Sequence, residues 1–414
     1  MGCCDAPGLM PIEQAMPIIL NQTPTVKETE SLAIEDAIGR VLAQDVRSPI
    51  NVPPFDNSAM DGYAVRIADL TASLTLPVIG KSFAGAPFDG QWPQGSCIRI
   101  MTGAQIPEGC DAIVMQEDVT PNGNDIQFNI DIAALKPQQH IRPTGDDIQT
   151  GQLAIEKGNR LTARDLPMLA SLGVAQVQVL RKPIVAVFST GDELKPVGCE
   201  LKAGEIYDSN RYGIRPLLDK FGCEVIDLGI IPDDEALLYE AFEKAKSIAD
   251  VVVTSGGVSV GEADYTKDIL EQQGEISFWK LAIKPGKPFA FGSLGNALFC
   301  GLPGNPVSAF VTAYVLVQPL IAKLSGESQW QEAPRLSAVS KSAFKKNPGR
   351  ADYQRAIFTV TAQGQLEVES TGNQSSGAFR SMSIANCFAI LERERGHVSI
   401  GETVQIQPFS AAMY

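Results

Sequence analysis

Residues 251–264 read VVVTSGGVSVGEAD and decide the fold. Their apolar, β-branched start predicts a strand buried on both faces, and the two glycines that follow predict a turn directly after it. Comparable apolar runs occupy residues 184–188, 225–230, 288–291 and 297–300, with helical patterns among them at 213–221, 234–248 and 265–272. Apolar strands that alternate with helices predict a parallel sheet covered on both faces, so we expect a doubly wound α/β core over residues 181–327.

Three further regions flank this core. Residues 8–47 and 146–180 carry apolar residues at helical spacing, and we expect them to form one discontinuous helical module. Between them, residues 48–145 hold short apolar runs punctuated by Pro and Gly, which is typical of an inserted β-rich domain. Residues 328–414 contain short apolar runs at 336–339, 353–360, 366–369, 387–391 and 404–408, which suit a small β-barrel or a sandwich.

The composition excludes several classes of protein. The chain has 414 residues and a net charge of −14, which repels phosphate backbones, so we expect no nucleic-acid partner. The longest apolar stretch, residues 311–324, is interrupted by Gln318, Pro319 and Lys323, so no membrane span is expected. The eight cysteines lack C-x-x-C spacing and only two histidines are present, which favours reduced thiols in the cytoplasm over disulfides or a zinc site.

Three predicted strands run into Gly- and Ser-containing turns, STGDE at 189–193, SGGVSVGEAD at 255–264 and GLPGNPVS at 301–308. Ligands of open α/β sheets bind at the carboxyl ends of the strands, and small residues there let backbone N–H groups approach an anion. Each turn alone could be an ordinary turn, but three at one sheet edge predict a binding site. None has the spacing of a Walker or Rossmann motif, which disfavours a standard ATPase or NAD enzyme.

Carboxylates follow the same strands, as expected for a Mg²⁺ site beside a phosphate-binding turn. The alternative for several of them is helix capping, which we prefer for Asp233 and Asp234, whereas a metal role is preferred for Asp264. The acidic residues of this edge are Asp192, Glu193, Asp233, Asp234, Glu262 and Asp264.

Two other segments are unusual. Residues 276–296 contain Lys280, Lys284 and Lys287 and no acidic residue, although the composition predicts about two acids there, so an anion site is favoured over a solvated loop. Residues 53–65, PPFDNSAMDGYAV, combine prolines, apolar residues and two acids. Asp61 before Gly62 could simply form a turn, but we expect it to deliver a polar group to a cleft.

Together these segments resemble the molybdopterin molybdenumtransferase family, known as MoeA in bacteria and as the E domain of gephyrin in animals. The resemblance spans nearly the whole chain from about residue 8. It implies a four-domain homodimer with an elongated first domain, a C-terminal β-barrel and an active site between subunits. It also implies a Mg²⁺-dependent transferase that inserts molybdate into adenylylated molybdopterin and releases AMP, working with a molybdopterin adenylyltransferase and molybdoenzyme maturation proteins.

The resemblance also assigns roles to residues. Asp192, Glu193, Asp233 and Asp264 would hold Mg²⁺, and Lys280, Lys284 and Lys287 would bind molybdate or phosphate. Asp61, Thr102, Arg142 and Asp147 would come from the opposing subunit. The catalytic set would be Asp61, Asp147, Glu193, Asp264, Lys280 and Lys284. The substrate contacts would be Thr102, Arg142, Thr190, Gly256, Gly257, Ser259, Lys287, Asn305, Ser308, Arg350 and Ser376.

Two alternatives remain open. The family that adenylylates molybdopterin from ATP uses the same kind of α/β core, but it consists essentially of that core alone. A peptide-binding scaffold of the gephyrin E-domain type would need no catalytic residues, whereas this chain carries the full set of acids and lysines.

Overall fold

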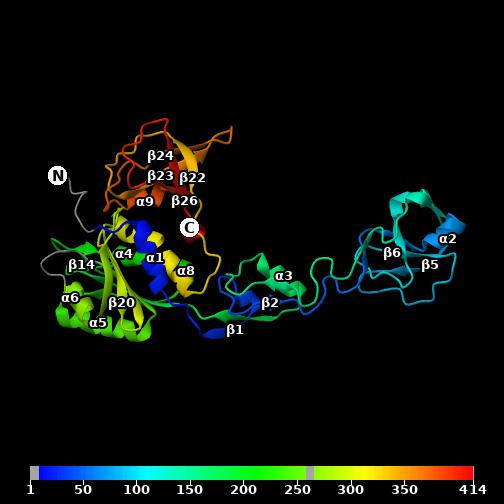
Figure 1. The fold of residues 1–414 in the computed structure, drawn as a ribbon, viewed down its shortest axis with the longest axis horizontal. Helices are drawn as coiled ribbons and strands as arrows, with labels where there is room; N and C mark the ends of the chain where they lie inside the picture. The colour runs from blue at the N-terminus through cyan, green and yellow to red at the C-terminus, as the bar shows by residue number, and fades with distance from the viewer. Residues whose placement is uncertain (1–8, 258–264, 414) are drawn as a thin grey trace.

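The computed structural model describes residues 9–257 and 265–413. The molecule is strongly elongated (Figure 1). The α/β core and the C-terminal domain lie together at one end, a small two-segment module follows, and a β-rich domain stands at the far end.

The core contains a six-stranded sheet of order β16-β13-β17-β21-β20-β18. Its first four strands are mutually parallel, as predicted, but β20 and β18 run antiparallel to their neighbours. Only Gly295 and Asn296 separate β20 from β21, and a connection this short cannot make a parallel crossover. The bounds are β13 (Ile184–Thr190), β16 (Glu224–Ile231), β17 (Val251–Ser255), β18 (Gly274–Lys280), β20 (Pro288–Leu294) and β21 (Ala297–Leu302).

Helices cover both faces of this sheet. On β13, Val185 and Val187 join one apolar cluster while Ala186 and Phe188 join another, which confirms that the strand is buried on both faces. The first cluster includes α1 (Ile12–Gln22), α4 (Asn210–Lys220) and the long helix of α7 (Pro306–Thr312), the π-helical η4 (Ala313–Val317) and α8 (Gln318–Leu324); the second includes α5 (Glu235–Ile248) and α6 (Tyr265–Gln273).

The helix formed by α7, η4 and α8 is the one helix among the described residues that is long and apolar enough to cross a membrane. It spans Pro306–Leu324, and 83% of its apolar 18-residue stretch is buried inside the protein. This degree of burial is that of a core helix, whose apolar residues are explained by packing against the sheet.

The module next to the core has fewer helices than predicted. Among the described residues of the first segment only those of α1 are α-helical, and α1 packs against the core. The rest pairs across more than a hundred residues of sequence, a long-range pairing that local spacing does not reveal. The elements are β1 (Thr29–Ala33) with β12 (Gln176–Leu180), β2 (Val46–Arg47) with β11 (Leu153–Ile155), the 3-10 turn η1 (Ile34–Asp36) and α3 (Asp165–Ser171).

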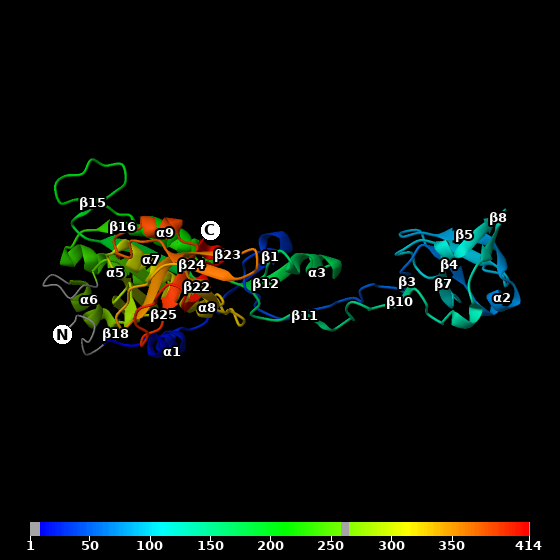
Figure 2. The ribbon, with the colours of Figure 1, turned by 90° about the horizontal axis from the view of Figure 1, so that it is seen from above.

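The far domain is a six-stranded sheet of order β7-β4-β6-β5-β9-β8 (Figure 2). Two extended stretches of chain join it to the rest of the molecule. Its elements are β3 (Asn57–Ser58), β4 (Gly62–Val65), α2 (Ile67–Ala72), β5 (Thr75–Ser82), β6 (Cys97–Ile100), β7 (Ala112–Met115), η2 (Gln116–Asp118), β8 (Val119–Asn122), β9 (Asp125–Phe128), η3 (Ile132–Ala134) and β10 (Ile141–Arg142).

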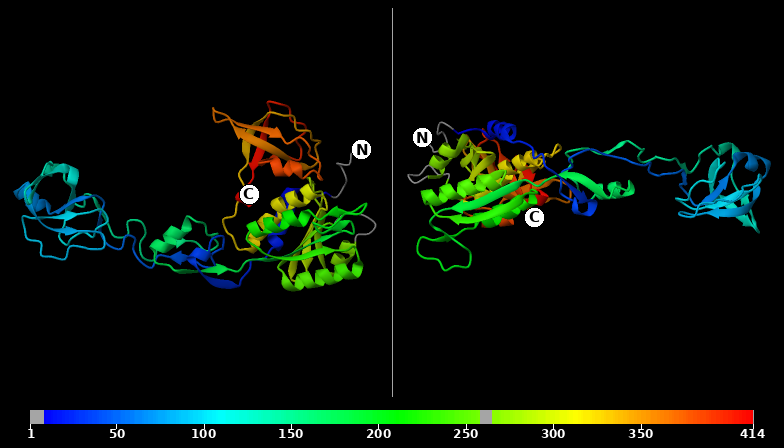
Figure 3. Two further views of the ribbon diagram at one scale, coloured as in Figure 1. Left: turned by 180° about the vertical axis from the view of Figure 1, so that it is seen from behind. Right: turned by 90° about the horizontal axis from the view of Figure 1, so that it is seen from below.

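The C-terminal domain is a small closed barrel, because β23 pairs with both β24 and β25 in a sheet of order β23-β24-β22-β26-β25. The core strand β19 (Ile283–Lys284) adds to this sheet beside β23, and the left view of Figure 3 shows the barrel on the core. The remaining elements are β22 (Leu336–Ser340), β23 (Ala351–Val360), β24 (Leu366–Ser370), α9 (Arg380–Ile384), β25 (Cys387–Leu391), β26 (Thr403–Pro408) and η5 (Ala411–Met413).

Candidate active site

The carboxyl ends of the parallel strands are in register and open onto a cavity. Thr190 at the end of β13 lies opposite Ile231, and Ser255 at the end of β17 lies opposite both Ser189 and Leu302. The cavity beside them has a volume of about 430 Å³. The predicted residues that line it are Thr190, Glu193, Asp233, Gly256, Gly257 and Asn305.

The Gly256-Gly257 turn lies directly on the end of β13. Gly256 has φ +95°, and a Cβ added there would stand 2.5 Å from the carbonyl oxygen of Thr190. Gly257 has φ +64°, and its Cβ would stand 2.4 Å from Oγ1 of Thr266. Only glycine fits both positions, so this turn brings main chain rather than side chain to the cavity wall, as close approach to an anion requires.

Acidic side chains line the same edge. Thr190 Oγ1 donates to Asp233 Oδ1 over 3.0 Å, and the Asp233 N–H donates to Asp192 Oδ1 over 3.1 Å. The Glu193 carboxylate folds back over Gly191, 2.7 Å from where a Cβ would be. Asp234 caps α5 by accepting from the N–H of Leu237, as expected. The same expectation was wrong for Asp233, which does not cap α5 and lines the cavity instead.

The donor set suits Mg²⁺, which commonly takes one or two protein carboxylates and fills its other positions with water and phosphate oxygens. Within residues 9–257 and 265–413, no group of three or more His, Cys, Asp or Glu could enclose a metal ion by itself. Ser259, Glu262 and Asp264, which the sequence placed in this site, lie outside the described residues.

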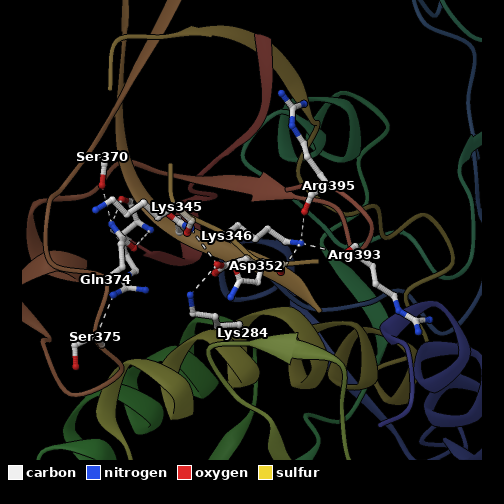
Figure 4. A network of polar contacts seen from close by, with 12 residues as sticks. Lys284, Lys345, Lys346, Asp352, Ser370, Gln374, Ser375, Arg393 and Arg395 are labelled. Carbon is white, nitrogen blue, oxygen red and sulfur yellow. Dashed lines mark hydrogen bonds and ion pairs between the residues drawn. The ribbon is translucent and has the colours of Figure 1, made fainter. Parts of the chain in front are cut away.

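The lysine segment reaches this edge because β18 and β20 are antiparallel. Lys280, the last residue of β18, lies opposite Pro288, the first of β20, and Pro288 lines the cavity. Lys280, Lys284 and Lys287 are half-buried and do not line it. The Lys284 ammonium instead forms an ion pair of 3.1 Å with Asp352 of the barrel (Figure 4).

Two barrel segments meet the core beside the lysines. Arg350 directly precedes β23, whose first residues Ala351 and Asp352 pair with Ile283 and Lys284. The carbonyl of Ser376 accepts from the N–H of Val307 at the start of α7. Arg350 and Ser376 therefore lie at the junction of core and barrel. Arg350 is next to the strand that pairs with Lys284, and Ser376 contacts Val307, so each meets core residues more than sixty positions earlier in the sequence. Ser308 is 3% exposed and does not line the cavity.

The other predicted residues lie far from the cavity of their own chain. Asp61 Oδ1 accepts from the N–H of Thr102 over 2.8 Å and from its hydroxyl over 2.7 Å, and these two hydrogen bonds lower the pKa of Asp61. Arg142 lies on β10, opposite Asn57, and the Asp147 N–H donates to Val52. All four belong to the far domain or to the chain leading to it (Figure 1).

Known proteins match this chain over nearly its whole length. A molybdopterin molybdenumtransferase of Haemophilus influenzae is 56% identical over 97% of this chain and 99% of its own length. The chain belongs to the molybdopterin molybdenumtransferase family. A molybdopterin molybdenumtransferase of a Nostoc species is 34% identical over 94% of this chain and 91% of its own length.

Family models and solved structures agree with this assignment to the molybdopterin molybdenumtransferases. Residues 10–173 match the MoeA N-terminal region (domains I and II), 186–323 a probable molybdopterin-binding domain and 337–409 the MoeA C-terminal region (domain IV). Two structures of the molybdopterin biosynthesis MoeA protein from Pyrococcus horikoshii superpose with TM-scores of 0.84 and 0.80, at 30% and 32% identity. Each covers 97% of this chain and 100% of its own. The predicted fold class is confirmed.

Several cavity residues of this molybdenumtransferase-family chain were not predicted from the sequence, among them the polar Asn210. Asn210, the first residue of α4, donates from Nδ2 to Ser255 Oγ and to the carbonyl of Gly304, both over 2.7 Å. It therefore ties the turn after β17 to the turn after β21. A polar residue before a helix usually indicates a cap, so the sequence alone gave no reason to select it.

Proposed function

We propose that this chain inserts molybdate into adenylylated molybdopterin in a Mg²⁺-dependent reaction that releases AMP. The observation that carries the proposal is the cavity at the sheet edge, which a glycine turn, Glu193 and Asp233 line. Asp192 accepts from the Asp233 N–H, and Lys280 lies opposite the cavity residue Pro288. Both substrates are anions, and such an edge offers backbone N–H groups and cations to hold them. The names of the relatives, molybdopterin molybdenumtransferases, support the same reaction.

The residues would divide the work by position. The main chain at Gly256 and Gly257 would hold a phosphate, and Asp192, Glu193 and Asp233 would hold Mg²⁺. When bound, Mg²⁺ would offset charge on the phosphoanhydride that is cleaved. Lys280, Lys284 and Lys287, with Arg350 and Ser376 at the junction, would bind the molybdate. No thiol nucleophile is needed, and burial raises the pKa of Cys97 and Cys387 to about 12.

The far domain would serve a second copy of the chain. Asp61, Thr102 and Arg142 belong to the far domain and Asp147 to the chain leading to it, away from the cavity of their own chain. A homodimer in which each far domain reaches the partner's cavity would give these residues a role, and isologous pairing would complete both sites equally. We place this dimer in the cytoplasm, downstream of an adenylyltransferase that supplies its substrate and upstream of molybdoenzyme maturation proteins.

The test is AMP release from purified adenylylated molybdopterin, with and without molybdate and Mg²⁺. We expect release that depends on both, and a loss of about a hundredfold or more in Glu193→Gln. Glu200→Gln is the matched control, because Glu200 is exposed in the loop between β14 (Leu194–Lys195) and β15 (Ile206–Tyr207). Absence of molybdate-dependent release defeats the proposal, and consumption of ATP with free molybdopterin would indicate an adenylyltransferase instead.

A further inference from the structure

The C-terminal barrel contains a buried carboxylate that faces the core. Asp352, near the start of β23, has a side chain that is only 2% exposed. Its Oδ2 accepts from Lys284 Nζ over 3.1 Å and from Gln354 Nε2 over 3.0 Å. Among the described residues, Lys284 is the one cation paired with this carboxylate.

Other cations nearby do not take the place of Lys284. Lys346 donates from Nζ to the carbonyls of Asn347, Arg393 and Arg395, as Figure 4 shows in part. Burial lowers the pKa of Lys346, and the nearby Asp352 carboxylate partly opposes that effect. A carboxylate buried to this degree is costly without a contacting cation, so the pairing with Lys284 is strongly preferred.

The backbone fixes the same pair. Strand β19 of the core lies parallel to the start of β23, with Lys284 opposite Asp352, and the N–H of Ala351 donates to the carbonyl of Ala282 over 2.9 Å. On its other side the segment rests on α7, since a Cβ on Gly286 would stand 2.3 Å from Cγ2 of Thr312. Core and barrel therefore hold the lysine segment between them.

The ammonium of Lys284 keeps capacity for a ligand in this arrangement. It has three N–H donors, one of which meets Asp352, and the side chain is 41% exposed. Among the described residues Lys284 Nζ has no other hydrogen-bond partner, and Arg350 and Ser376 belong to the same junction of core and barrel. A long, flexible lysine side chain would otherwise sample many rotamers, and fixing it in advance reduces the entropy lost on binding.

We propose that Asp352 is a positioning residue, whose buried carboxylate fixes the Lys284 ammonium at the junction of core and barrel so that its free N–H groups meet the anionic substrate. This inference rests on the proposed function for the identity of that anion, molybdate. Besides supplying Arg350 and Ser376, the barrel then acts on the reaction by fixing where a cation of the core stands.

The direct test measures how accessible Lys284 is, and it does not depend on activity. Purified full-length protein is acylated briefly with acetic anhydride, and each lysine is quantified by mass spectrometry. In Asp352→Asn, which keeps the side-chain volume, we expect Lys284 to be labelled several-fold faster, while the exposed Lys345 is unchanged. Glu367→Gln is the control, because it breaks the exposed Lys341–Glu367 pair of the same barrel and should alter Lys341 alone.

The kinetic test uses the same variants. We expect Asp352→Asn to raise KM for molybdate about tenfold or more, with little change in KM for adenylylated molybdopterin, because one anion contact is misplaced. Gln354→Leu removes the second donor to the carboxylate, together with the Gln354 hydrogen bond to the carbonyl of Lys345. It should shift Lys284 labelling and KM in the same direction by less, which keeps the proposal testable if Asp352→Asn does not fold.

Unchanged Lys284 labelling in a folded variant overturns the positioning role, and so does an equal rise of both KM values. An inactive wild-type protein would instead refute the proposed function, while the labelling result would still decide whether Asp352 holds Lys284.

Discussion

At the scale of the single residue, the site depends on glycine where another residue type would not fit. The turn at Gly256 touches the end of β13 with its main chain, and its φ of +95° is one that side chains disfavour. The nearest obstacle is a backbone oxygen, that of Thr190, which cannot swing away as a flexible side chain could. Gly256 therefore shapes the cavity by the absence of a side chain.

Gly256→Ala should destabilise the protein by about 3 kcal/mol, because the strain of alanine at this positive φ and the clash of its Cβ with the Thr190 carbonyl oxygen add. The matched variant is Gly401→Ala, where φ is +88° and nothing lies within 4 Å of the new Cβ, so about 1 kcal/mol of strain is expected alone. Urea unfolding followed by circular dichroism measures both. Equal losses in the two variants would show that the close approach to Thr190 carries no cost.

At the scale of the element, the parallel strands and their turns could be predicted because they depend on local patterns. Residues 251–253 are apolar and β-branched, and two glycines follow at 256 and 257, which suffices to place a buried strand and a turn. Pairings between distant segments could not be predicted, since spacing within β1 says nothing about its partner β12. For the same reason the sequence marked Lys284 as a cation but not Asp352 as its partner.

Two neighbouring acids just before α5 are expected to have different roles, one in stability and one in the reaction. Asp234 caps the helix, so Asp234→Ala should cost about 1 kcal/mol of stability and leave AMP release nearly unchanged. Asp233 lines the cavity and accepts from Thr190, so Asp233→Ala should chiefly reduce AMP release. Thermal unfolding and the AMP assay on both variants check this. The reverse pattern would mean that Asp233 is the structural residue of the two.

At the scale of the whole molecule, the elongated shape separates two groups of predicted site residues. The cavity group stands at one end of the chain and the group around Asp61 at the other (Figure 2). An active site shared between two subunits accounts for both groups, and it makes a prediction that no single-subunit site shares.

Inactive variants from opposite ends should complement each other. Asp61→Ala and Glu193→Ala, unfolded and refolded together, should recover about a quarter of wild-type AMP release, because half of the dimers are mixed and each mixed dimer has one intact site. Each variant refolded alone is the control. Recovery no greater than the sum of the two controls would place all the catalytic residues within one subunit.

The two connecting segments that lead to the far domain lie side by side. The N–H of Ser48 donates to the carbonyl of Gln152, and the N–H of Gly151 donates to the carbonyl of Ser48. Because the two segments meet there, replacing residues 49–150 with a tight turn would join β2 to β11 as a hairpin. The shortened chain would retain the cavity, the lysine segment and the barrel. The corresponding domain of a relative could be inserted at the same position.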